Sequence, residues 1–273
     1  MDKAVIINDY PYHIQVIGQG KPTWLFLHGF VGSAADYEQV TPQGTRIYVD
    51  LLGFGPHMPI VTDPQRFTAT QQSQDLIALL DLLALEQVNL VGYSMGARLA
   101  LAMAIQYPTR VRQLFLESGT AGLADADDRA ARQAADVMKA QEIESQGMAA
   151  FVAKWEQLPL FASQRELPAT QQAFMHAQRV QQTATNVANS LRYFGTGAMP
   201  NYWPKLASLQ VPTILITGMA DTKFTLINEQ MAAQIPIVTH EQVVGAGHNV
   251  HFEQPISVTK LLDRWARHAS QAD

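Results

Sequence analysis

The pentapeptide Gly92-Tyr93-Ser94-Met95-Gly96 places a hydroxyl group between two glycines at the spacing of a nucleophile elbow. It follows the apolar run 87–91 and precedes residues 96–106, whose pattern predicts a helix. A serine on so sharp a turn has a strained backbone, and a side chain at position 92 or 96 would collide with the neighbouring strand or helix. We therefore expect the Ser94 hydroxyl to lie exposed at the end of a strand, above a helix N-terminus.

An acid and a base follow Ser94 in the chain order that this elbow uses: serine, aspartate, histidine. Asp221 comes shortly after the run 214–218, and His248 comes directly after 243–247. Because a serine hydroxyl is a weak base and a weak nucleophile at its ordinary pKa, His248 would have to accept its proton. Asp221 would fix the imidazole tautomer and stabilise the imidazolium. The sequence predicts a Ser94–His248–Asp221 triad.

The segment Leu27-His28-Gly29-Phe30 directly follows an earlier apolar run. A backbone amide there, that of Phe30, would pair with the amide of Met95 to form an oxyanion hole. These two amides are the predicted stabilisers of negative charge.

Other chemistries have weaker support. The chain has no cysteine, which excludes thiolate nucleophiles and cysteine-bound metals. His248 and His251 are spaced like zinc ligands but lack a third ligand cluster nearby, so no metal site is expected. Residues 53–55 lack the third glycine of a dinucleotide fingerprint, and the acidic run 125–128 fits a solvated helix N-terminus.

The composition is that of a globular protein, with 47% hydrophobic and 16% charged residues among 273. A net charge of −5 would repel nucleic acid and anionic membrane surfaces, so neither is an expected partner. The N-terminus lacks the pattern of a signal peptide, and the longest apolar run, 76–85, is too short to span a bilayer. These features predict a cytoplasmic protein, and they do not predict its oligomeric state.

Short apolar runs alternate with helical patterns, and this alternation is typical of an α/β fold with a mostly parallel sheet. The expected strands are 4–7, 13–17, 23–27, 46–51, 87–91, 111–117, 212–217 and 237–244, with a turn at 8–11. The expected helices of this part are 70–85, 96–106 and 255–268. Residues 122–206 are rich in Ala, Gln and Arg and have no convincing strand. We expect a core of residues 1–121 and 207–273 with an inserted helical cap, 122–206.

Several arginines indicate the charge of the predicted substrate. Arg98 lies one helical turn beyond Ser94, near the expected pocket, where its guanidinium could bind a carboxylate. The alternative is an ion pair between Arg98 and a carboxylate of the cap. The cap adds further candidates, Arg129, Arg132, Arg179 and Arg192, together with Trp155. A small anionic substrate is therefore expected.

The chain resembles the 2-succinyl-6-hydroxy-2,4-cyclohexadiene-1-carboxylate synthases of menaquinone biosynthesis, members of the α/β-hydrolase superfamily. The resemblance covers nearly the whole chain. The residues that support it are Phe26-Leu27-His28-Gly29-Phe30, Val91-Gly92-Tyr93-Ser94-Met95-Gly96-Ala97-Arg98, Glu117-Ser118-Gly119, Arg129-Ala130-Ala131-Arg132-Gln133, Trp155 with Pro159-Leu160-Phe161-Ala162-Ser163, and Gly247-His248-Asn249-Val250-His251.

The resemblance implies a lyase that removes pyruvate from 2-succinyl-5-enolpyruvyl-6-hydroxy-3-cyclohexene-1-carboxylate without a metal or organic cofactor. It implies that Ser94 abstracts a ring proton as a general base, so that no acyl-enzyme forms. It also implies that Arg98, Arg132 and Arg179 hold the substrate carboxylates, with Tyr93 and Trp155 lining the pocket. Two departures are the run 50–55, where the family has a proline and a histidine, and the poorly matching flanks of Arg179.

Two alternatives remain open from the sequence. A carboxylesterase or carbon–carbon bond hydrolase would use the same triad with Ser94 as nucleophile. Such pockets are usually apolar, and Arg98 beside the serine does not suit a neutral ester. The second alternative is a ligand-binding signalling module that keeps the triad, because a fold alone does not determine activity.

Overall fold

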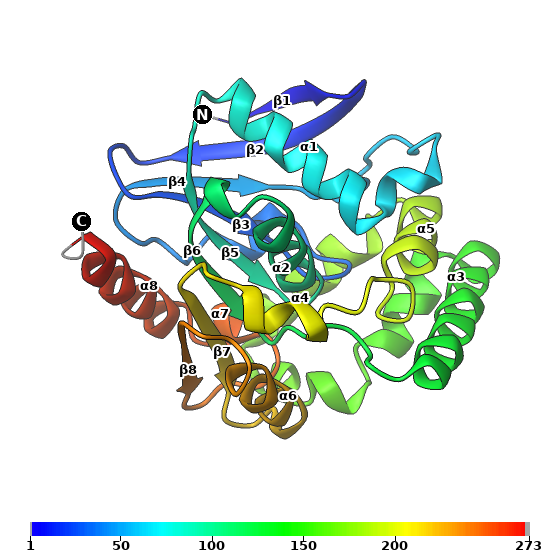
Figure 1. Cartoon of the computed structure of the whole chain (residues 1–273). Helices are drawn as coiled ribbons and strands as arrows, with labels where there is room; N and C mark the ends of the chain where they lie inside the picture. Colours follow the sequence, from blue (N-terminus) through cyan, green and yellow to red (C-terminus); the bar gives the residue numbers. More distant parts are fainter. Residues whose placement is uncertain (1, 271–273) are drawn as a thin grey trace.

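An eight-stranded, mostly parallel sheet runs through the computed structural model, which describes residues 2–270 (Figure 1). The strands are β1 (Asp2–Ile7), β2 (Tyr10–Ile17), β3 (Thr23–Leu27), β4 (Thr45–Val49), β5 (Val88–Tyr93), β6 (Val111–Glu117), β7 (Thr213–Gly218) and β8 (Val238–Val243). Their spatial order is β1-β2-β4-β3-β5-β6-β7-β8. β2 pairs antiparallel with both β1 and β4, and the other neighbours are parallel, so the predicted α/β architecture is confirmed.

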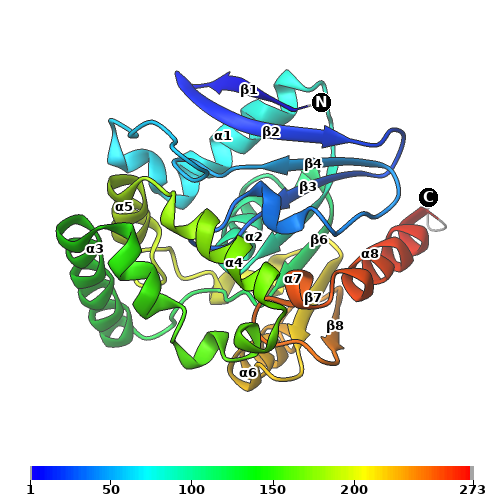
Figure 2. The same cartoon turned by 180° about the vertical axis from the view of Figure 1, so that it is seen from behind.

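Helices cover both faces of the sheet (Figures 1 and 2). They are α1 (Ala69–Leu82), α2 (Met95–Gln106), α3 (Ala126–Trp155), α4 (Ala169–Val180), α5 (Ala184–Phe194), α6 (Thr222–Ala232), α7 (Val250–Glu253) and α8 (Pro255–Ser270). Short 3₁₀ turns join them, of which η1 (Ala34–Tyr37), η4 (Pro159–Phe161) and η5 (Ser163–Glu166) lie near the site described below.

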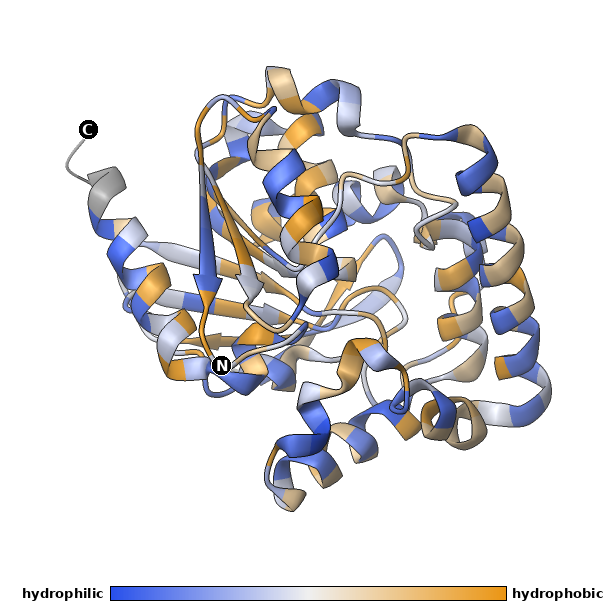
Figure 3. Ribbon diagram, turned by 90° about the horizontal axis from the view of Figure 1, so that it is seen from below, coloured by the Kyte–Doolittle hydropathy of each residue, from blue (hydrophilic) through white to orange (hydrophobic). Residues whose placement is uncertain are grey.

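Alternate residues of each strand face different hydrophobic layers, as the two-residue period of a strand requires. Leu25 and Leu27 of β3 belong to the layer that contains buried residues of α1, α2 and α6. Trp24 and Phe26 belong to the other layer, with buried residues of α7 and α8. Figure 3 shows the central strands as predominantly hydrophobic. The inner parallel strands β3, β5, β6 and β7 are almost wholly buried, as is usual for parallel strands with helices on both faces.

The opening hairpin is tighter than the sequence predicts. Asn8 and Asp9 have φ angles of 47° and 62°, which is the left-handed pair of a two-residue hairpin turn. The expected turn over 8–11 is therefore wrong, because Tyr10 and Pro11 already pair with Ile7 and Ile6. A proline fits there since its fixed φ is compatible with extended backbone.

Other expected boundaries shift by a few residues. The predicted strand 46–51 ends earlier, at Val49, and the carboxylate of Asp50 then accepts a hydrogen bond from the Ala34 amide at 2.7 Å. The helices α6 and α7, which lie directly after the predicted acid and base, have no counterpart among the elements expected from the sequence.

Residues 118–212 contain helices and no strand. Gly147, with φ 80° and ψ 169°, interrupts α3 and kinks it. α3 packs along α5, and both helices lie to one side of the sheet in Figures 1 and 2, whereas α4 overlaps the sheet in these views. The boundaries of the predicted core and cap as separate units remain a prediction.

None of the helices within residues 2–270 combines the length and the apolarity that crossing a membrane would require.

Candidate active site

Ser94 occupies the strained turn between β5 and α2. Its φ of 51° and ψ of −101° lie outside the regions that most residues adopt, and its amide donates to the Glu117 carbonyl at 2.8 Å. A Cβ on Gly92 would lie 2.4 Å from the Gly96 carbonyl oxygen, and one on Gly96 would lie 2.1 Å from the Leu27 oxygen. Only glycine fits at these two positions, which matches the steric argument from the sequence.

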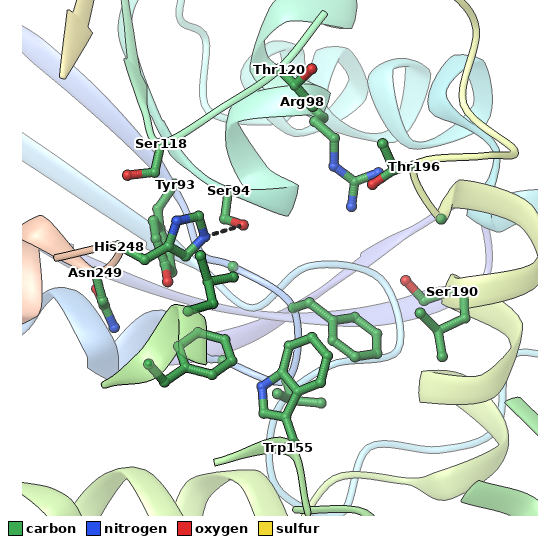
Figure 4. Close-up of a pocket in the computed structure, with 18 of the residues that line it drawn as sticks. Tyr93, Ser94, Arg98, Ser118, Thr120, Trp155, Ser190, Thr196, His248 and Asn249 are labelled. Atoms are coloured by element: carbon green, nitrogen blue, oxygen red, sulfur yellow. Dashed lines mark hydrogen bonds between the residues drawn. The ribbon is translucent and has the colours of Figure 1, made fainter. Parts of the chain in front are cut away.

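The structure brings the predicted acid and base to Ser94. The Nε2 atom of His248 lies 3.1 Å from the Ser94 hydroxyl, and its Nδ1 atom lies 2.7 Å from Asp221 Oδ2 (Figure 4 shows the first contact). His248 is 2% exposed and Asp221 6%. Asp221 also caps the N-terminus of α6, where its other oxygen accepts a hydrogen bond from the Phe224 amide at 3.1 Å. This fixed carboxylate favours the tautomer with a proton on Nδ1 and leaves Nε2 to accept from Ser94.

The predicted oxyanion hole lies where β3 and β5 end. Met95 is the first residue of α2, so its amide has no acceptor within the helix. The side chain of Phe30 packs against Trp155, with ring centroids 5.3 Å apart. Within residues 2–270 neither amide donates a hydrogen bond to another protein group, and the oxyanion function remains a prediction.

A buried histidine holds the loop that carries Phe30. His28 Nε2 accepts the Leu51 amide at 3.0 Å, so the proton lies on Nδ1, which donates to the Gly29 carbonyl at 2.7 Å. Burial lowers the pKa of His28, which keeps the imidazole neutral in these two hydrogen bonds.

Ser94 and His248 open into a cavity between the sheet and the helices α3 to α5. It is also lined by Tyr93, Arg98, Arg132, Trp155 and Arg179, and therefore by all five predicted substrate-binding residues. In Figure 4, His248 and Arg98 lie on opposite sides of Ser94. The cavity therefore has the Ser94–His248 pair at one end and the Arg98 guanidinium at the other.

Arg98 is buried without a carboxylate partner. Its Nη1 donates to the Phe194 carbonyl at 2.6 Å, and its guanidinium lies 4.9 Å from the Phe194 ring centroid. Among the described residues Arg98 forms no ion pair. The structure therefore does not contain the alternative, an ion pair between Arg98 and a cap carboxylate. Desolvation by burial, with a smaller contribution from Arg132, lowers the pKa of Arg98 to about 10. Arg98 thus has no carboxylate in direct contact, although the nearby Asp136 carboxylate, which Arg132 binds, opposes the lowering of its pKa.

The other two predicted arginines are already paired. Arg132 binds Asp136 through Nε at 2.9 and 3.0 Å, one helical turn away on α3. Arg179 binds Glu156 at 3.0 Å and Gln164 at 2.9 Å. Both still line the cavity, but their charges are partly compensated.

The remaining cap candidates differ in position. Trp155 stacks with Phe151 and packs on Phe161 within the cavity. Arg129 donates to two carbonyls of the segment just before α3, and Arg192 pairs with Glu144 at 2.6 Å on the surface. These two arginines lie outside the cavity lining, so of the four candidate arginines of the cap only Arg132 and Arg179 reach it.

The sequence analysis missed two further cations at the cavity, Lys139 and Lys223. Arg132, Asp136 and Lys139 are spaced i, i+4 and i+7 on α3, which places them on one helix face. This spacing could have identified Lys139 from the sequence, once Arg132 was predicted to face the cavity. Lys223 lies two residues after Asp221, at the start of α6.

His248 and His251, the two histidines that are spaced like zinc ligands, each contact a carboxylate instead. His248 contacts Asp221, and His251 Nδ1 lies 3.0 Å from both carboxylate oxygens of Glu117. Within residues 2–270, no three His, Asp or Glu side chains gather as a metal site requires.

The fold and this site define an α/β-hydrolase-fold enzyme. The model of the alpha/beta hydrolase fold family matches residues 22–255. An esterase from Thermogutta terrifontis superposes with a TM-score of 0.85 at 23% identity, over 98% of this chain and 99% of the other, which supports the fold alone.

More similar proteins narrow the family. A Bacillus subtilis (strain 168) protein, provisionally named 2-succinyl-6-hydroxy-2,4-cyclohexadiene-1-carboxylate synthase, is 38% identical over 88% of this chain and 88% of its own length. The synthase of that name from Klebsiella pneumoniae (strain 342) is 32% identical over 90% of this chain and 94% of its own. MenH from S. aureus superposes with a TM-score of 0.88 at 31% identity, over 94% and 99% of the two chains. The chain belongs to this synthase family within the α/β-hydrolase fold, which confirms the resemblance.

Proposed function

We propose that this enzyme eliminates pyruvate from 2-succinyl-5-enolpyruvyl-6-hydroxy-3-cyclohexene-1-carboxylate and forms 2-succinyl-6-hydroxy-2,4-cyclohexadiene-1-carboxylate. The observation that carries the proposal is the buried, unpaired Arg98 in the same cavity as the Ser94–His248 pair. An anionic substrate would compensate this charge, whereas a neutral ester would not. The names of the similar proteins support the same reaction.

In this proposal Ser94 acts as a general base. Its hydroxyl takes the ring proton while its own proton passes to His248 Nε2, and Asp221 stabilises the resulting imidazolium. The electron pair of the broken C–H bond forms the new ring double bond as the C–O bond to the enolpyruvyl group breaks. Proton return to the departing enolate gives pyruvate, so no water is consumed.

Negative charge develops on the substrate when the proton leaves. The backbone amides of Phe30 and Met95 are the proposed donors to that charge. Met95 begins α2 directly after β5, and the hydrogen bonds of His28 hold the loop that carries Phe30, so both amides would need little reorganisation during the reaction.

Arg98, Arg132 and Arg179 are the proposed partners of the substrate carboxylates, with Tyr93 and Trp155 against its ring and succinyl chain. Arg98 is expected to contribute most, since it has no competing carboxylate. We also propose that residues 122–206 act as a cap over the core of 1–121 and 207–273 and close the site from solvent.

The deciding experiment measures pyruvate release from the enolpyruvyl substrate and cleavage of a short-chain nitrophenyl ester by the same purified protein. Pyruvate release that is lost in Ser94→Ala, with negligible ester cleavage, supports the lyase. Ester cleavage without pyruvate would assign the protein to the hydrolases, with Ser94 as nucleophile. Ligand-induced stabilisation without either turnover would favour the signalling alternative.

A further inference from the structure

A second carboxylate–imidazole pair lies close to the triad, formed by Glu117 at the end of β6 and His251 in α7. The Nδ1 atom of His251 lies 3.0 Å from both carboxylate oxygens, and the backbone amide of His251 donates to one of them at 3.1 Å. Since a carboxylate only accepts hydrogen bonds, the proton of this imidazole lies on Nδ1. Both residues are buried, at 1% and 0% exposure, and neither lines the active-site cavity. The pair therefore acts on the site only through the residues that it contacts.

Glu117 also holds the nucleophile, through its backbone. Its carbonyl accepts the Ser94 amide at 2.8 Å, which continues the pairing of β5 with β6 beyond Tyr93. The backbone at Ser94 is strained, with a φ of 51°, and such strain persists only where the surroundings determine the conformation. One residue at the end of β6 thus binds the nucleophile segment through its carbonyl and α7 through its carboxylate.

These contacts close a circuit around the active site. The amide of Ser94 binds the carbonyl of Glu117, and the carboxylate of Glu117 binds His251. The backbone then leads from His251 back to His248, whose Nε2 lies 3.1 Å from the Ser94 hydroxyl (Figure 4). Because α7 begins between the two histidines, at Val250, a displacement of His251 would move His248 as well.

Aromatic rings enclose the imidazole of His251. The Tyr37 ring stacks on it with centroids 4.0 Å apart, and the Tyr93 ring packs edge-on at 4.9 Å. Tyr93 directly precedes Ser94, and its ring also packs 5.4 Å from the His248 ring. Within residues 2–270 the Nε2 atom of His251 has no hydrogen-bond partner. The orientation of this imidazole therefore rests on Glu117 and on the packing of the two tyrosines.

We propose that Glu117 and His251 are positioning residues that hold His248 and Ser94 at the distance of proton transfer by joining the end of β6 to α7. Asp221 orients the His248 ring, whereas the second pair would fix the segment that carries it. A displacement of about 1 Å at reacting groups can lower a rate about 10²-fold. The inference rests on the proposed function for the reaction that it serves, although any reaction of the Ser94 hydroxyl needs the same alignment.

The test uses His251→Phe, which keeps an aromatic ring against Tyr37 and removes the Nδ1 donor. His251→Asn is the conservative variant, because its side-chain amide can donate from nearly the same position as Nδ1. His13→Phe is the matched control. Its Nδ1 atom also lies 3.0 Å from a buried carboxylate, that of Asp50, but at the sheet edge and outside the cavity lining. If His251→Phe does not fold, Glu117→Gln replaces it, because the amide NH₂ group opposes a donor where the carboxylate accepts.

Two rates separate positioning from stability. The rate constant for modification of Ser94 by a fluorophosphonate reports the Ser94–His248 alignment without the natural substrate. In His251→Phe this constant and kcat for pyruvate release should each fall about tenfold, while KM stays within about twofold of the parent. In Glu117→Gln both rates should fall about threefold. His251→Asn should recover most of both rates, and His13→Phe should lower the thermal midpoint while both rates stay at the parent value.

The outcomes distinguish this inference from the proposed function. If the parent reacts with the fluorophosphonate but releases no pyruvate, the lyase proposal fails, and a slower fluorophosphonate reaction in His251→Phe still supports the positioning role. Parent rates in the folded His251→Phe, with only a lower thermal midpoint, would reduce the pair to a structural role and overturn the inference. Equal losses in His251→Phe and His251→Asn would overturn it as well, because the donor at Nδ1 would then not matter.

Discussion

The two sides of the cavity are built by different means. On the sheet side, Ser94, Asp221 and His248 follow strand ends, and backbone hydrogen bonds or helix starts hold the segments that carry them. On the side of α3 to α5, Arg132 and Arg179 project from helices, and single ion pairs with Asp136 and Glu156 set their positions.

This difference explains where each kind of precision is needed. Proton transfer depends on distances that must hold within a fraction of an ångström, and strand ends of a buried parallel sheet provide such rigidity. Binding of carboxylates by long arginine side chains tolerates movement, and ion pairs can exchange one partner for another. Substitutions on the two sides should therefore differ in size and in kind.

The largest effect is expected from Ser94→Ala on the sheet side. Without the hydroxyl, no group lies between His248 and the substrate proton, so kcat for pyruvate release should fall about 10⁴-fold. The thermal midpoint should change little, because the backbone strain at position 94 is the same for alanine. Residual activity above a few per cent, measured after excluding traces of parent enzyme, would mean that another group is the base.

A smaller but still large effect is expected from Arg98→Met, at the junction of the two sides. Loss of a charge-assisted hydrogen bond to substrate of about 2–3 kcal/mol corresponds to about 10²-fold in kcat/KM. The free energy of unfolding should change by less than about 1 kcal/mol, since loss of the bond to Phe194 is offset by removal of a buried unpaired charge.

The control for Arg98→Met is the modification of Ser94 by a fluorophosphonate. This reaction needs no anionic substrate and should proceed at the parent rate. Unchanged kcat/KM together with a strong loss of stability would assign Arg98 a purely structural role and weaken the comparison.

A still smaller effect is expected on the helical side. In Arg179→Gln, KM should rise about tenfold with kcat nearly unchanged, because the arginine already shares its charge with Glu156. The reciprocal variant, Glu156→Gln, frees Arg179 and should lower KM severalfold. A rise of KM in Glu156→Gln would show that the ion pair positions the arginine rather than competes with substrate.

The same division limits what the sequence can predict. The sheet side depends on local rules: apolar strands, glycines where no Cβ fits, and the chain order of Ser94, Asp221 and His248. These rules predicted the strands, and the three residues lie within hydrogen-bonding distance of one another in the order expected. They failed at the turn Asn8-Asp9, where two consecutive left-handed residues shorten the loop.

The helical side depends on side-chain partners that sequence spacing does not determine. Residues 122–206 were correctly expected to be helical, but Gly147 kinks a helix that composition alone would leave continuous. The partner of Arg179 comes from residue 156, beyond the end of α3, and the partner of Arg98 is a backbone carbonyl of α5. Such contacts arise only when the helices pack, so the pattern of residues alone did not separate the four cap arginines, and only the family resemblance singled out Arg132 and Arg179.

The smallest effect should appear in stability alone, at the sheet edge away from the cavity. A hydrogen bond to the Asp50 carboxylate, opposed by desolvation and helped by Asp2, raises the pKa of His13 to about 9. Protonated His13 is thus favoured in the folded state. Its contribution is fully present below the unfolded pKa of about 6.5 and is lost as pH rises through about 9.

The parent should therefore lose thermal stability between pH 6.5 and 9 relative to His13→Gln, by one to a few degrees, while kcat and KM at neutral pH remain the same. Thermal midpoints of both proteins across this range measure the difference directly, and the subtraction removes other titrating groups. Parallel curves would mean that the Asp2 and Asp50 contacts do not favour the charged histidine. A change in KM would mean that the sheet edge and the cavity are less independent than the two modes of construction imply.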